Sequence, residues 1–129
     1  AVALSLGATF VARAFSGDIL QTKEIIKAAI QHKGYALVDV FQPCVVFNKQ
    51  NTYQWFKEMG YYVSEEYDKT DKLKALETVF NLDRLALGVI YQETGRPSYE
   101  TLVREGNESL STRSLDRSAA LDQLMDTYK

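Results

Sequence analysis

The sequence has few of the residues on which disulfide, zinc and iron–sulfur chemistry depend. Its 129 residues include one cysteine, Cys44, and one histidine, His32. A single cysteine excludes a disulfide within the chain. One residue of each kind also excludes the usual zinc and thiolate iron–sulfur ligand sets. We therefore predict no metal-ligating residues in this chain.

Basic excess and long apolar runs are missing too. The net charge is −2, whereas nucleic-acid binding leaves a strongly basic footprint. No segment approaches the ~18 apolar residues that indicate a membrane span, so we predict a cytoplasmic protein without nucleic-acid or membrane partners. The 46% hydrophobic content is enough for one buried core. The sequence starts without methionine, and its first residues resemble the end of a helix that has no N-terminal cap. We therefore expect the chain to be a piece of a longer protein.

The stretch from Gly34 to Asn48 organises the predicted fold. Within it, Tyr35 to Phe41 form an apolar run interrupted only by Asp39. Such a run predicts a strand buried on both faces, as in parallel sheets. Ligands of open parallel sheets gather beyond the carboxyl ends of the strands. The loop from Gln42 to Asn48 is therefore where we expect function.

A strand and a helix are predicted before this stretch. Thr9 to Ala14 read as the strand, and Asp18 as the helix cap, with Gln21 as its reciprocal capping-box partner. Gly34 suits a left-handed position after the helix. Together these segments predict a parallel, right-handed β-α-β crossover. Helical spacing predicts an apolar helix face made of Ile19, Thr22, Ile26, Ala29 and Ile30.

The second half continues the α/β pattern. We expect a short aromatic helix over 52–59 capped by Asn51, and a half turn or a strand stub over 61–63. A further helix starts at Thr70 or Asp71, a third strand covers 87–91, and a short helix begins near Arg96. The predicted class is α/β with parallel β-α-β layers over 1–103, followed over 104–129 by a linker and a helical C-terminal tail that docks. The helix after Asp71 has a predicted inner stripe of Leu73, Leu76, Val79 and Phe80.

A Cys44–His32 catalytic dyad is excluded by the predicted strand between them. Seven residues, Tyr35 to Phe41, at ~3.3 Å each, separate the two side chains by roughly 20 Å. His32 is then a surface residue near a helix C-terminus. Asp39 is either a site residue or, as we favour, a buried structural carboxylate paired with Arg13 on the neighbouring strand.

Asp18 has a second interpretation. Gly-Asp-Gly followed about thirty residues later by Asn binds magnesium and the diphosphate of thiamine diphosphate. Here Ile19 replaces the second glycine, and Asn48 lies well beyond the tip of its strand. The cap interpretation of Asp18 is favoured on both grounds.

Several stretches together resemble one enzyme family. The first three stretches are residues 8–18, 25–34 and 38–48. The third of these contains the string Gln-Pro-Cys-Val-Val-Phe-Asn, and a fourth stretch, at 51–56, reads Asn-Thr-Tyr-Gln-Trp-Phe. With 87–91 and 96–100, they resemble the C-terminal half of the thiamine-diphosphate-binding module in the β subunit of 2-oxoacid:ferredoxin oxidoreductases, the pyruvate:ferredoxin oxidoreductase-like enzymes. The resemblance covers about 4–100.

The resemblance implies a role in a larger enzyme. Such enzymes decarboxylate a 2-oxoacid on thiamine diphosphate and magnesium, pass electrons through iron–sulfur partners to ferredoxin, and form acyl-coenzyme A. The family's cofactor fingerprint is absent from this chain, so we expect no catalytic residue here and an inactive chain in isolation. The alternative is a non-catalytic α/β assembly module that keeps the frame. By position, the residues expected near the cofactor or a subunit boundary are Gln42, Pro43, Cys44, Phe47 and Asn48.

Apolar surface predicts association. A chain of this size rarely leaves so many large apolar side chains wet. We expect a hetero-oligomer with other subunits or a homo-oligomer, with the C-terminal helix taking part. The side chains concerned are Trp55, Phe56, Tyr61, Tyr62, Leu121, Leu124, Met125 and Tyr128.

Overall fold

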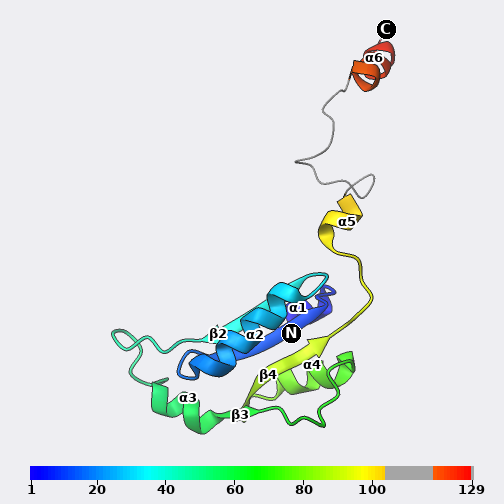
Figure 1. The fold of residues 1–129 in the computed structure, drawn as a ribbon. Coiled ribbons are helices and arrows are strands. Elements are labelled where there is room, and N and C mark those ends of the chain that lie inside the picture. The colour runs from blue at the N-terminus through cyan, green and yellow to red at the C-terminus, as the bar shows by residue number, and fades with distance from the viewer. Residues whose placement is uncertain (104–117, 129) are drawn as a thin grey trace. The chain divides into compact units, whose positions relative to one another are not determined.

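The computed structural model describes residues 1–103 and 118–128. The chain divides into two units, Ala1–Tyr99 and Glu100–Lys129, and α5 (Tyr99–Val103) spans their boundary. The second unit also contains α6 (Ser118–Asp126). No helix in the described ranges is long and apolar enough to cross a membrane. The elements of the first unit are α1 (Val2–Ser5), β1 (Phe10–Phe15), α2 (Ile19–Gln31), β2 (Ala36–Phe41), α3 (Tyr53–Met59), β3 (Gly60–Tyr62), α4 (Lys72–Phe80) and β4 (Leu85–Gln92) (Figure 1).

A four-stranded sheet in the order β2-β1-β4-β3 forms the centre of the first unit. β1 and β2 run parallel, from Phe10 opposite Ala36 to Phe15 opposite Phe41. With α2 between them they form the predicted β-α-β crossover, so the α/β class is confirmed. β4 runs antiparallel to β1 and parallel to β3, an arrangement that the sequence did not predict.

β1 is the buried strand of this sheet. Phe10, Ala12 and Ala14 pack on one face with Ile25 of α2. Val11 points to the other face, into a cluster that α1, α4 and β4 complete. Since only Arg13 of the six β1 residues escapes full burial, the strand that the sheet surrounds is β1.

The prediction that Tyr35 to Phe41 is buried on both faces is wrong. Every residue of β2 is half-buried or exposed, and Val40 keeps 40% of its surface. β2 is an edge strand, and among the described residues only β1 pairs with it. The apolar run therefore marks a strand whose neighbours are incomplete within the described chain.

Both predicted helix stripes are only partly right: Val79 and Leu76 of the α4 stripe and Ala29 of the α2 stripe pack on the core, but other members point outward. Ile25 is the buried residue of α2, while Ile19 and Ile30 are 76% and 79% exposed. In α4 the buried residues are Ala75 and Val79, and both Leu73 and Phe80 point outward. The inward faces carry alanines beside Ile25 and Val79, so each helix packs on the sheet while several larger apolar residues are left on the outside.

The helix caps are partly as predicted. Asp18 caps α2, since Gln21 N donates to Asp18 Oδ1 at 3.0 Å, but the reciprocal half of the box does not form. Asp18 N donates instead to the Phe15 carbonyl, and Gln21 Oε1 has no partner among the described residues. α3 is capped by Thr52, not by the predicted Asn51.

Other predicted segments are also found. Residues 60–62 form the strand stub β3, which was one of the two alternatives. Asp71 caps α4 with bonds from two backbone amides, and β4 is longer than predicted. The short helix near Arg96 begins at Tyr99. Of the linker and tail predicted over 104–129, residues 104–117 and 129 lie outside the described residues.

Candidate functional site

The carboxyl ends of β1 and β2 lie side by side, and an aromatic cluster fixes the next segment there. Phe15 ends β1, Phe41 ends β2, and the two are register partners. Phe56 of α3 stacks on both rings, with centroids 5.7 Å from Phe15 and 5.1 Å from Phe41. Trp55 meets Phe56 edge-on at 4.9 Å. The loop from 42 to 52 is therefore held at both ends on the edge of the sheet where function is predicted.

Asn48 organises this loop from within. Its Oδ1 accepts hydrogen bonds from the backbone amides of Gln50 and Asn51, each at 3.0 Å. Its Nδ2 donates to Asn51 Oδ1 at 3.0 Å, and its own amide donates to the Cys44 carbonyl at 3.0 Å. Because the carboxamide is engaged inside the loop, its visible role is to fix the loop's conformation.

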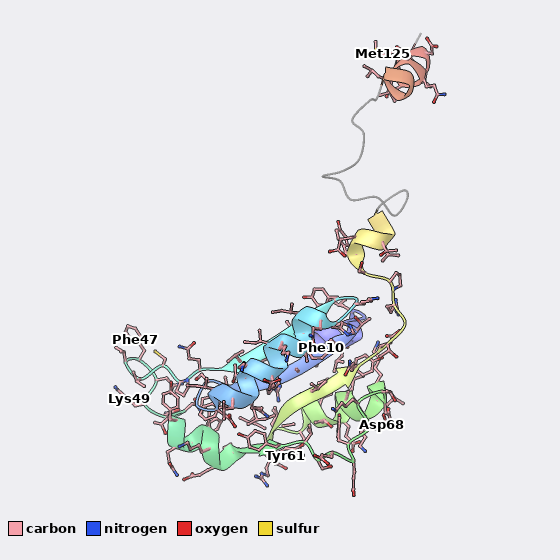
Figure 2. All side chains as sticks on the ribbon, viewed as in Figure 1. Phe10, Phe47, Lys49, Tyr61, Asp68 and Met125 are labelled. Atoms are coloured by element: carbon pink, nitrogen blue, oxygen red, sulfur yellow. The ribbon has the colours of Figure 1, made fainter. Side chains whose placement is uncertain are left out.

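Cys44 is an exposed thiol within this loop. The backbone amide of Phe47 lowers the pKa of the thiol most, and those of Val46 and Asn48 add to the shift, because donated hydrogen bonds favour the thiolate. Phe47 stands at the outer tip of the loop with 90% of its surface exposed (Figure 2).

A hollow of about 350 Å³ lies beside the loop. Four of the five residues predicted near a cofactor or subunit boundary border it, and Phe47 does not. The structure thus brings most of the predicted loop residues together around one concave surface. They share it with side chains of β2, α3 and β4; the lining consists of Phe41, Gln42, Pro43, Cys44, Asn48, Asn51, Trp55, Phe56 and Leu85.

Asp18 is near the same edge, and both its carboxylate oxygens are engaged. Oδ1 accepts the Gln21 amide, and Oδ2 accepts the hydroxyl of Tyr62 at 2.5 Å. The Tyr62 hydroxyl is the main cause of a lowered Asp18 pKa, with the Gln21 amide next, and Asp18 in turn raises the pKa of Tyr62. The carboxylate caps α2 and is hydrogen-bonded to Tyr62 of β3, which supports the interpretation of Asp18 as a helix cap.

The residues present do not fit a thiamine diphosphate–magnesium site. Both carboxylate oxygens of Asp18 are engaged by Gln21 and Tyr62, and the Asn48 carboxamide is engaged within its own loop. Within 1–103 and 118–128, no three His, Cys, Asp or Glu side chains gather as a metal site would need. No step of a reaction can therefore be assigned to metal or diphosphate ligands of the described chain.

His32 and Asp39 occupy structural positions. His32 Nε2 lies 2.8 Å from Thr9 Oγ1, beside the amino end of β2, whereas Cys44 lies past its carboxyl end. The predicted surface position of His32 is only partly right, because the ring is half-buried and packs 5.3 Å from Phe10. Arg13 Nε reaches Asp39 Oδ2 at 3.2 Å, as predicted, but the Asp39 side chain is 51% exposed and not buried.

Long-range contacts at both ends of the strands were not predicted from the sequence. The Tyr62–Asp18 bond joins residues 44 apart, and no local pattern signals it. Thr9 is 4% exposed, and its hydroxyl meets His32 and both the amide and carbonyl of Tyr35. A small polar residue directly before an apolar strand was the available signal for Thr9.

The chain is similar to β subunits of 2-oxoacid:ferredoxin oxidoreductases. The family model for the C-terminal region of the pyruvate ferredoxin oxidoreductase β subunit matches residues 44–108. A 2-oxoacid:ferredoxin oxidoreductase subunit β from Sulfolobus sp. is 38% identical over 116 residues, covering 81% of this chain and 38% of the relative. Subunit β of 2-oxoacid:ferredoxin oxidoreductase 2 from Aeropyrum pernix is 36% identical over 111 residues, covering 77% of this chain and 36% of its own length.

A solved structure shows the same fold. A 2-oxoglutarate:ferredoxin oxidoreductase from Magnetococcus marinus, with 2-oxoglutarate, coenzyme A and succinyl-CoA bound, superposes with a TM-score of 0.79 at 29% identity. The match covers 93% of this chain and 42% of that one. This chain thus spans well under half the length of the relatives that it matches. The family match begins at Cys44, inside the organised loop. Together, the family match and the similarity to the Sulfolobus subunit show that the chain belongs to the family of β subunits of 2-oxoacid:ferredoxin oxidoreductases.

Proposed function

We propose that this chain supports the oxidative decarboxylation of a 2-oxoacid to acyl-coenzyme A, with electrons passed to ferredoxin. The observation that carries the proposal is the family match over 44–108, which includes the organised loop and α3. The Sulfolobus and Aeropyrum relatives, named as β subunits of such oxidoreductases, support it. The Magnetococcus structure, which holds a 2-oxoacid and coenzyme A, supports the same substrate class.

Thiamine diphosphate and magnesium would belong to the complete enzyme and supply its carbonyl chemistry. This chain contributes a rigid edge of the sheet, because Asn48 and the Phe15–Phe41–Phe56 stack fix the loop without help from a ligand. We place the loop residues near the cofactor or the subunit boundary. Phe47 suits a boundary contact, since an aromatic ring that is 90% exposed gains by burial against another subunit.

The proposed partners are the other subunits of the oxidoreductase, with ferredoxin and coenzyme A meeting the assembled complex. The assembly would be a hetero-oligomer with these subunits, or a homo-oligomer of copies of this chain, in the cytoplasm. Residues 1–103 would serve as the C-terminal portion of the cofactor-binding module, and 104–129 as a linker and docking helix.

A chimera tests the proposed reaction. This chain replaces the matched region of the Sulfolobus β subunit, the chimera is purified with that enzyme's other subunits, and 2-oxoacid-dependent reduction of ferredoxin is measured with coenzyme A. We expect activity, and a loss of activity on Asn48→Ala because the loop loses the hydrogen bonds of the carboxamide. Thr78→Ala on the distant α4 is the control. A complex that assembles but has no activity with any 2-oxoacid would favour the non-catalytic assembly module.

The chain on its own should not bind the cofactor tightly. Tight diphosphate binding through magnesium needs metal ligands, and no three His, Cys, Asp or Glu side chains gather within the described residues as a metal site would need. Titration calorimetry with thiamine diphosphate and magnesium should show no saturable binding at micromolar concentrations. A micromolar dissociation constant for the lone chain would contradict this expectation and return Asp18 and Asn48 to the role of ligands.

A further inference from the structure

Arg13 is a mostly enclosed arginine whose guanidinium is only partly used. It lies in the middle of β1, and 16% of its side chain is exposed. Its Nε donates to Asp39 Oδ2 at 3.2 Å, and its Cζ lies 4.9 Å from the centre of the Phe41 ring. Within residues 1–103 and 118–128, neither Nη atom of Arg13 has a hydrogen-bond acceptor. Enclosed N–H donors without acceptors cost free energy, so this side chain is suited to a further acceptor.

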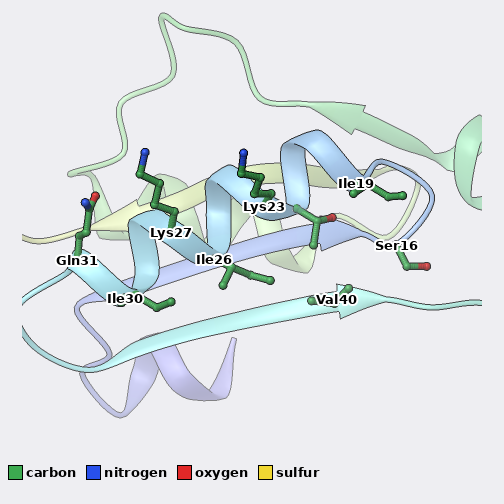
Figure 3. A pocket seen from close by; sticks show the side chains of 9 residues that line it. Ser16, Ile19, Lys23, Ile26, Lys27, Ile30, Gln31 and Val40 are labelled. Carbon is green, nitrogen blue, oxygen red and sulfur yellow. The ribbon is translucent and has the colours of Figure 1, made fainter.

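The Arg13–Asp39 pair lies on the face of the sheet that is turned away from α2. Val40, the next residue of β2, lines a groove with the isoleucines of α2 (Figure 3), and successive residues of a strand point to opposite faces. On the face of the pair, Leu37 packs on the core cluster that includes α1, and Phe41 stacks on α3. The pair therefore forms a polar gap between two apolar contacts, one with α1 and one with α3.

This polar gap offers donors and an acceptor side by side. The donors are the Nη groups of Arg13, and the acceptor is Asp39 Oδ1, which accepts no hydrogen bond from the described part of the chain. Because the two charges of the pair cancel, the gap has little net charge with which to attract a free small anion. A protein surface can insert a carboxylate toward Arg13 and bring a donor to Asp39 at the same time. The planar arginine fork is also suited to bidentate binding of a carboxylate.

We propose that Arg13 binds an Asp or Glu carboxylate of another subunit in the assembled enzyme, at an interface that continues from the loop over 42–52. The Phe41 ring beneath the guanidinium also borders the hollow beside that loop, so the polar gap and the loop belong to one continuous surface. Arginine is enriched among the residues whose removal weakens interfaces most. This inference rests on the proposed subunit boundary at the loop, not on the proposed reaction.

Chemical modification of the Sulfolobus chimera described above tests the contact directly. Phenylglyoxal, which modifies free guanidinium groups, is applied to the chimeric β subunit alone and to its complex with the other subunits. Mass spectrometry then measures the modification of Arg13. We expect Arg13 to be modified in the β subunit alone and to lose this modification in the complex. An Arg13 that is already protected in the β subunit alone would overturn the proposal, because its acceptor would then come from the same subunit.

A matched pair of variants separates a binding role from a structural one. Arg13→Lys keeps the charge but loses the fork, and it should raise the dissociation constant of the complex about tenfold to a hundredfold. Arg84→Lys is the control, because Arg84 also lies over an aromatic ring, that of Tyr61 at 5.3 Å, but its Nη2 already donates to the Gly60 carbonyl at 3.2 Å. The thermal midpoint of the β subunit alone should change equally in both variants.

The remaining outcomes also decide the proposal. A lower thermal midpoint for Arg13→Lys with an unchanged dissociation constant would show a structural role and overturn it. Protection of Arg13 by a free 2-oxoacid in the β subunit alone would overturn it too, because the polar gap would then bind a small anion. So would a chimera that does not associate with the other subunits. A complex that protects Arg13 but converts no 2-oxoacid would support this inference and refute the proposed reaction.

Discussion

Replacing Gly34 by alanine should destabilise the chain by several times the usual cost of a surface substitution. Gly34 has φ of +128°, and an added Cβ would overlap the Thr9 hydroxyl. That hydroxyl is the centre of a hydrogen-bond network. It lies 2.8 Å from His32 Nε2, accepts a hydrogen bond from the Tyr35 amide at 3.0 Å and donates one to the Tyr35 carbonyl at 3.2 Å. The substitution therefore affects both the backbone at the start of β2 and its link to β1.

The magnitude follows from two contributions. A residue with a Cβ at positive φ costs roughly 1–2 kcal/mol. Displacing Thr9 leaves buried donors or acceptors without partners, at about 1–3 kcal/mol. The expected loss in the free energy of unfolding is then about 2–5 kcal/mol. With a urea m-value of roughly 1–3 kcal/mol/M, this lowers the urea midpoint by about 0.7–5 M.

Urea unfolding followed by far-ultraviolet circular dichroism measures the loss, and Gly95→Ala is the matched control. Gly95 also has positive φ, +88°, but an added Cβ would meet nothing within 4 Å. Its substitution carries the backbone cost of about 1–2 kcal/mol alone. The difference between the two variants isolates the Thr9 contact. An equal loss in the free energy of unfolding for Gly34→Ala and Gly95→Ala would refute a stabilising role of the Thr9 hydrogen bonds.

Three further predictions concern the edge of the sheet near the loop. The pKa of Asp18 is lowered in the folded chain, chiefly by the Tyr62 hydroxyl, so its contribution to stability is present above the unfolded pKa of about 3.9 and is lost as pH falls through the folded value. Thermal unfolding from pH 6 to pH 2 should show a smaller loss for Asp18→Asn than for the parent; identical slopes would argue against the coupling. Cys44 should react with iodoacetamide at pH 7.5 faster than a free cysteine, because the loop amides lower its pKa, and mass spectrometry that shows an equal or slower rate would contradict this. Thr52→Ala should cost about 1 kcal/mol in urea unfolding through loss of the α3 cap, and a larger loss from Asn51→Ala would reverse the assignment of the cap.

Local signals in the sequence predicted the order and type of most elements. Asp18 before an apolar-periodic segment located α2, and the run after Gly34 located β2. Both depend on neighbours within a few residues, which the sequence displays directly. The ion pair of Arg13 and Asp39 could also be predicted, because parallel pairing of adjacent strands fixes which residues lie opposite.

Burial was the less predictable property. The apolar content of β2 and the isoleucines of α2 predicted buried positions, but burial depends on which other segments lie alongside. Here the long-range pairing of β1 with β4 places β1 in the middle and leaves β2 at the edge. Of the site, the loop and its position beyond β2 could be predicted. The Tyr62–Asp18 bond and the Phe56 stack could not, because they join segments far apart in sequence.

The pairing of β1 also has a kinetic consequence. Its partner on one side, β2, follows directly after α2, whereas Phe10 meets Gln92 of β4 on the other side. During synthesis the β1-α2-β2 crossover can close as soon as β2 has left the ribosome, but β1 keeps an unpaired edge until the last residues of β4 emerge. At about 5–20 residues per second, the intervening stretch of chain takes seconds to appear. A nascent chain halted before Leu85 should therefore be open to strand addition along β1, and translational pausing within α4 should increase aggregation.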